Sequence, residues 1–303
     1  MYKTIKNSRF LLFFLKGTLF LFVAFLFYKQ LSKITPEQLS SISLTLPLWF
    51  LTAVLLVIPN QWFEFKKWRK IVSSFSTITP KSTLIKSYLA GNITGFVTPN
   101  LIGNFIGRMY FFERRYRPKI IVLTLLANGS QFLTSIYFGL LSITLFGFKP
   151  FQIPPLNPIY LTVSISTTLI LYFTFERLLK HFPLLKKINI HLLDSFEIRF
   201  SLLLYSVLRY LIFSFQYFLI LCSFGVPIDL KLIPIIWSIY FWSTLTPSLW
   251  FGKIVIRESI SIWILGQYIE NTGIILISSI LLWCINQGIP AIIGFPFLKM
   301  QKK

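Results

Sequence analysis

Long apolar runs, separated by short polar segments, dominate this sequence. The first run covers residues 10–28 and the last covers residues 274–297. A helix needs about 20 mostly apolar residues to cross the hydrocarbon core of a bilayer, so runs of this length predict membrane-spanning helices. Six spans are expected, at about residues 10–28, 46–65, 120–148, 158–175, 200–224 and 274–297.

Two further apolar blocks, residues 84–110 and 232–266, are interrupted by glycine and proline, which weaken or end a regular helix. Basic clusters flank the first block at both ends, whereas Asp229 and Glu270 flank the second. Because cytoplasmic loops are enriched in Lys and Arg, each block is expected to enter and leave on one face, and the two blocks on opposite faces. The expected fold is an all-α integral membrane protein with about six transmembrane helices and two re-entrant, Pro/Gly-broken helical hairpins.

The interrupted blocks share a pattern. The first contains Thr-Pro at residues 98–99, then Gly103 and Arg108. The second contains Thr-Pro at residues 246–247, then Gly252 and Arg257, with the same spacing from glycine to arginine. Broken apolar segments at corresponding positions of two halves are typical of inverted repeats with a substrate site at their interface. We therefore predict a single polytopic domain over residues 1–303, with repeat-like halves at about 44–148 and 200–297.

The charge balance narrows the class of partner. Only 13% of the residues are charged, compared with about 25% in ordinary soluble domains, and 30 Lys and Arg oppose 9 Asp and Glu. The cations lie in short clusters between apolar runs and form no folded basic face, so nucleic acid is not the expected partner. The expected partner is anionic phospholipid. The positive-inside rule predicts a multi-pass protein of the cell membrane with cytoplasmic termini. The sequence leaves open whether the chain also binds another membrane protein or forms a homo-oligomer.

Charged residues within membrane segments are costly and mark functional sites. Arg108 and Arg257 are the leading candidates, because an arginine makes bidentate contacts with phosphate, and Glu258 is a candidate partner of Arg257. The alternative is that each arginine only extends to the lipid interface. Arg209 is a third intramembrane cation. The candidate lipid-binding or substrate-binding residues are Asn92, Thr98, Pro99, Asn100, Gly103, Asn104, Arg108, Arg209, Thr246, Pro247, Gly252, Lys253, Arg257 and Glu258.

Other polar and aromatic residues are interpreted structurally. Asn128, Gln131 and Gln216 are polar at membrane depth. Lining a pathway is one role for these amides, and hydrogen bonding between helices is the favoured one. The eight tryptophans are expected near span ends as interfacial anchors. His191 and its acidic neighbours at spacings of three fit a solvated loop better than a metal or acid-base site. No catalytic residue, metal or cofactor is predicted, which makes an enzyme the less favoured class.

Residues 91–99, Gly-Asn-Ile-Thr-Gly-Phe-Val-Thr-Pro, run into Gly103 and Arg108, and Thr246-Pro247 leads to Arg257-Glu258. These segments resemble the transmembrane domain of lysylphosphatidylglycerol synthases. In bifunctional members that domain is associated with flipping the lysylated lipid, and the resemblance implies a stand-alone member without the synthase domain. Many relatives have a glutamate directly after the motif glycine, where this chain has Asn104 and Lys253.

The function that this resemblance implies is flippase-like translocation of an anionic or lipid-linked head group. A membrane-embedded lipid transferase, or an accessory subunit of one, is the alternative from another class, although no catalytic carboxylates are evident. A scaffold that recruits partners within the membrane is the third hypothesis, and it would leave the paired motifs as helix-breaking structure only.

Overall fold

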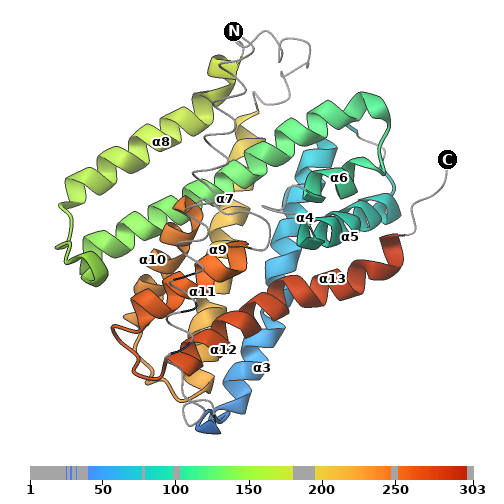
Figure 1. The fold of residues 1–303 in the computed structure, drawn as a ribbon. Coiled ribbons are helices and arrows are strands. Elements are labelled where there is room, and N and C mark those ends of the chain that lie inside the picture. Colours follow the sequence, from blue (N-terminus) through green and yellow to red (C-terminus); the bar gives the residue numbers. More distant parts are fainter. Residues whose placement is uncertain are drawn as a thin grey trace, which may run out of the picture.

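The computed structural model describes residues 25, 28, 32, 40–76, 79–97, 103–179, 195–246 and 252–298 (Figure 1). Regular structure within these residues is helical, and one isolated β-bridge joins Phe148 and Ile153. The predicted span at residues 10–28 falls almost entirely outside the described residues. In chain order the α-helices are α3 (Pro47–Leu55), α4 (Val57–Ser73), α5 (Lys81–Val97), α6 (Gly103–Met109), α7 (Arg117–Phe146), α8 (Pro158–Leu179), α9 (Phe196–Ser223), α10 (Leu232–Leu245), α11 (Gly252–Leu265), α12 (Thr272–Trp283) and α13 (Ile289–Gly294).

Four helical segments of the described chain are long and apolar enough to cross a membrane. They are Pro47–Ser73, Arg114–Phe146, Phe196–Ser223 and Thr272–Gly294. Two shorter apolar helices cover Pro158–Thr174 and Leu232–Leu245. Large apolar side chains such as Leu48 and Ile292 are more than 70% exposed, which is unfavourable in water and natural against lipid tails. The chain is therefore an α-helical membrane protein. Four of the six predicted spans coincide with these four long segments.

The segment formed by α3 and α4 runs antiparallel to α9. At one end the backbone N–H of Thr45 donates to the carbonyl of Ser223 at 2.9 Å. At the other end Lys70 Nζ lies 2.5 Å from Glu197 Oε1. Between them the buried Gln216 of α9 donates from Nε2 to the carbonyl of Ala53 at 2.8 Å, which confirms the interhelical bond predicted for this amide.

Two pairs of shorter helices lie on either side of this antiparallel pair (Figure 1). Helix α5 packs against α6, and α10 packs against α11. Helix α5 also packs against α13, whereas α10 packs against α7. The α5–α6 pair thus contacts the long segment Thr272–Gly294, of which α13 is the end, and the α10–α11 pair contacts the long helix α7. Helix α8, which follows the first half and precedes the second along the chain, packs along α7 at the edge of the bundle (Figure 1).

Small residues allow α5 and α6 to approach closely. A Cβ atom added at Gly107 would lie only 2.5 Å from the carbonyl oxygen of Ala90, so no side chain fits there. Thr94 Oγ1 donates to the carbonyl of Gly103 at 2.6 Å and to that of Ala90 at 2.8 Å. Close packing of this kind is typical of membrane helices with small residues at the contact. It places Arg108, the next residue, in the interior of the protein.

A π-helical turn, Cys284–Gly288, joins α12 to α13. Pro290 has no N–H, so the carbonyl of Asn286, four residues earlier, lacks its usual helical donor. The side chain of Gln61 in α4 replaces that donor, because its Nε2 lies 3.0 Å from Asn286 O. The helix break therefore connects the last helix to α4 and brings the polar residues of the turn beside it.

Candidate functional site

Glu64 of α4 forms ion pairs with three cations, and we call these four residues the Glu64 cluster. Glu64 Oε2 lies 2.5 Å from Arg209 NH1 of α9 and 3.4 Å from Lys67 Nζ of its own helix. Glu64 Oε1 lies 3.2 Å from Arg108 NH2 of α6. In the described part of the chain one carboxylate thus faces three cationic groups, which leaves a formal excess of two positive charges in this cluster.

Aromatic and amide groups hold the two arginines in place. Arg108 is 1% exposed, and its guanidinium carbon lies 4.9 Å from the ring centroid of Trp68 and 5.7 Å from that of Tyr88. Cation–π contacts of this kind stabilise a desolvated guanidinium. Arg209 Nε donates to Asn60 Oδ1 at 2.9 Å. Both arginines are therefore fixed by several neighbours and do not extend to the lipid interface.

A cavity of about 100 Å³ lies beside the cluster. Its volume accommodates several water-sized groups, because one water needs about 10–15 Å³ by this measure. Helices α4, α5, α6, α7, α9 and α13 and the π-helical turn contribute to its wall. The lining residues are Gln61, Glu64, Lys67, Gly91, Asn92, Gly95, Asn104, Asn128, Gln131, Arg209, Asn286, Gln287 and Pro290.

The first predicted motif lies at this site. Asn92 and Asn104 line the cavity, as does Gly91, whose added Cβ would lie 2.7 Å from Arg108 Cγ. Gly103 is buried and accepts the hydrogen bond of Thr94. Thr98, Pro99 and Asn100 fall outside the described residues.

Arg209 also belongs to the site, and so do two of the amides predicted at membrane depth. Asn128 and Gln131 line the cavity, which is the role that the sequence offered beside hydrogen bonding between helices. Gln131 Oε1 is buried and has no hydrogen-bond partner among the described residues. These amides face the cavity because α7 passes beside α9 and α6 at this level.

The second predicted motif forms a separate arrangement. Arg257 NH2 lies 2.5 Å from Glu258 Oε1 and donates to the carbonyl of Ser279 at 3.0 Å. Thr246 ends α10, and its Oγ1 donates to the carbonyl of Trp242 at 2.8 Å. None of these residues lines the cavity, so the structure does not bring Arg257 to the site of Arg108. Gly252 begins α11; Pro247 and the side chain of Lys253 fall outside what the structure describes.

Several site residues were missed from the sequence, above all Glu64, Lys67 and Trp68. Trp68, expected as an interfacial anchor, is fully buried beneath Arg108. A signal was present in α4, where polar positions recur with the period of a helix and so form one face. The positions of that face are Asn60, Gln61, Glu64, Lys67 and Trp68.

No family model matches this chain, and no curated protein matches it. The fold and the site therefore define the class on their own: an α-helical membrane protein with a polar cavity whose described wall has an excess of positive charge.

Proposed function

We propose that this protein is a flippase-like translocator that binds the anionic or lipid-linked head group of a membrane lipid in the cavity beside the Glu64 cluster. The carrying observation is the unbalanced charge of that cluster. A buried charge without a partner is strongly unfavourable, and a phosphate would provide the missing negative charge. Lys67 and Arg209 line the cavity and would contact that phosphate, Arg209 as a donor of charge-assisted hydrogen bonds.

The packing of the helices supports an inverted-repeat arrangement as part of this proposal. The α5–α6 pair of the first half contacts α13 of the second, and the α10–α11 pair of the second half contacts α7 of the first. Two related halves would show this reciprocal packing if each placed its helical hairpin against the other. Helix α8 lies between the two halves along the chain and crosses the membrane once more. The second half, which begins with α9, therefore starts on the face opposite to the start of α3. Broken helices that meet near the middle of the membrane are the usual place for a transporter's substrate site.

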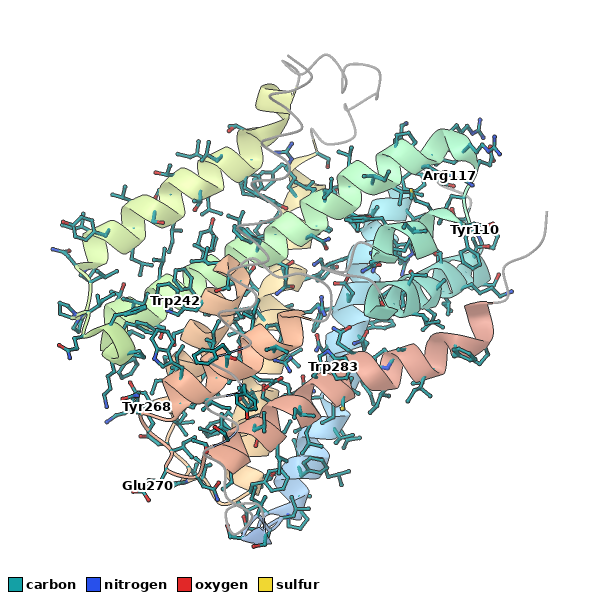
Figure 2. The ribbon with its side chains drawn as sticks, in the orientation of Figure 1. Tyr110, Arg117, Trp242, Tyr268, Glu270 and Trp283 are labelled. Atoms are coloured by element: carbon teal, nitrogen blue, oxygen red, sulfur yellow. The ribbon has the colours of Figure 1, made fainter. Side chains whose placement is uncertain are left out.

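Charge supports an orientation. Figure 2 shows Tyr110 and Arg117 at one end of the bundle and Tyr268 and Glu270 at the other. Basic residues concentrate around the first end, from Lys66 to Lys70 and from Arg114 to Lys119. By the positive-inside rule this end faces the cytoplasm of a cell-membrane protein.

Cysteine labelling tests this topology. Cysteines are introduced one at a time into a Cys284→Ser variant that keeps the buried Cys222. Those placed at Lys81 or Lys119 are expected to react with a membrane-impermeant reagent only from the cytoplasmic face. Cysteines at Asp229 and Glu270 are expected to react only from the outside. Cys222 is buried and serves as an internal control for intact structure. If the two cysteines of one pair reacted from opposite faces, the result would contradict the inverted arrangement.

Translocation itself is tested in reconstituted vesicles with a fluorescent anionic lipid. Arg209→Gln is expected to slow flipping at least tenfold, since a hydrogen bond to a charged group contributes about 1.5–3 kcal/mol. The matched control is Arg115→Gln, because Arg115 pairs with Glu113 and its side chain is 69% exposed. Equal rates for wild type and protein-free vesicles would refute the translocator and leave the transferase and scaffold hypotheses.

A further inference from the structure

We infer that the head group bound in this cavity is a phosphate-linked polyol or sugar, rich in hydroxyl groups and free of positive charge. This inference rests on the proposed function and adds the chemical class of the substrate. It differs from what the family resemblance implies, because a lysylated head group carries amino groups.

The composition of the cavity wall is the first observation. Seven of the thirteen described lining residues are asparagine or glutamine, and the remaining uncharged ones are Gly91, Gly95 and Pro290. This described part of the wall has no large apolar side chain, which makes it unsuited to an acyl chain. Carboxamides provide donors and acceptors in equal measure, which is the pattern that hydroxyl groups require.

Unpartnered oxygens are the second observation. Asn104 Oδ1 and Gln131 Oε1 belong to lining residues, and each is buried without a hydrogen-bond partner among the described residues. Buried polar atoms are nearly always satisfied, so these two acceptors indicate a ligand that donates. A phosphodiester has only acceptors and satisfies neither. Hydroxyl groups next to the phosphate would satisfy both.

Ammonium groups also donate, but the charges of the site argue against them. Glu64 is the single acidic residue of the described wall, and both of its oxygens already contact cations. A cationic head group would meet two unbalanced positive charges at short range, which is strongly repulsive in a medium of low dielectric constant. Choline recognition uses an aromatic cage, and no aromatic side chain belongs to the described wall.

Lipid binding by the full chain in detergent tests the inference, measured by native mass spectrometry with lipids of matched acyl chains. Phosphatidylinositol is expected to bind at least tenfold more tightly than phosphatidic acid, which has the phosphate without the polyol, and than phosphatidylcholine. Equal binding of phosphatidic acid, or stronger binding of phosphatidylcholine, would overturn the inference.

Substitutions in the cavity wall test whether the preference for phosphatidylinositol arises in this cavity. Gln131→Leu is expected to weaken phosphatidylinositol binding at least fivefold, and Asn128→Leu provides the same test if Gln131→Leu does not fold. Gln267→Leu is the control, because Gln267 is exposed and lies outside the cavity wall. An unchanged preference in a folded Gln131→Leu or Asn128→Leu variant would place hydroxyl recognition elsewhere and refute the assignment.

Two further arms separate this inference from the proposed function. Selective binding of phosphatidylinositol without flipping in vesicles would refute translocation and support the head-group assignment. Flipping of all lipids at one rate, without selective binding, would refute the assignment alone. If free inositol phosphate binds as tightly as the lipid, the phosphate-polyol chemistry is supported and the ligand is soluble, which refutes the lipid function.

Discussion

Glu64→Gln is expected to lower the free energy of unfolding by about 3–5 kcal/mol, the usual cost of breaking a buried ion pair by removing one partner. The glutamine leaves Lys67, Arg108 and Arg209 without the carboxylate that all three contact. Thermal unfolding of the purified protein in detergent, followed by tryptophan fluorescence, measures the loss.

The matched control is Glu197→Gln. Within the described residues Glu197 pairs with Lys70 alone, and its side chain is 78% exposed, so solvent replaces the lost contact and the unfolding temperature is expected to change little. Added phosphatidylinositol is expected to recover more stability in Glu64→Gln than in wild type, since its phosphate takes the place of the carboxylate. Equal unfolding temperatures for wild type and Glu64→Gln would show that the cluster does not depend on this charge.

Gly107→Ala is expected to destabilise the protein by about 1–3 kcal/mol, as overpacking of a tight contact does, and to slow lipid flipping. The new methyl group would lie 2.5 Å from the carbonyl oxygen of Ala90, which belongs to the backbone and has no rotamer to change. Helix α6 must then move away from α5, and Arg108 moves with it, away from Glu64. Thermal unfolding and the vesicle assay together measure both effects.

Gly129→Ala is the control for this change. An added Cβ at Gly129 has no atom of the described residues within 4 Å, and alanine favours a helix over glycine by about 1 kcal/mol. Its stability is expected to equal or exceed that of wild type. If Gly107→Ala behaves like Gly129→Ala, close packing of α5 and α6 does not position Arg108.

The membrane class could be predicted from the sequence because span length is a local property. Hydrophobic runs at about residues 46–65, 120–148, 200–224 and 274–297 coincide with the four long apolar helices. The run at 158–175 forms a shorter apolar helix. The broken blocks were also evident, because glycine and proline act on the backbone where they stand.

The site was only partly predictable. Arg108 and Arg209 were identified because a cation in an apolar run is rare, but the partner that brings them together was not. Glu64 lies 44 residues from Arg108 and 145 residues from Arg209 along the chain. Such contacts depend on which helices become neighbours, and local periodicity does not encode that choice.

By itself, then, the sequence determined that the chain forms membrane-length helices with two interruptions, since the chemistry of each residue and its near neighbours decides this. The pairing of Arg257 with Glu258 was predicted from the sequence and is confirmed. Only the tertiary structure decided that three cations share Glu64, that the Arg257–Glu258 pair lies away from the cavity, and that Asn286 meets Gln61, 225 residues away. The reason is physical: a buried charge selects its partners from all groups that packing brings near, and packing is a property of the whole bundle.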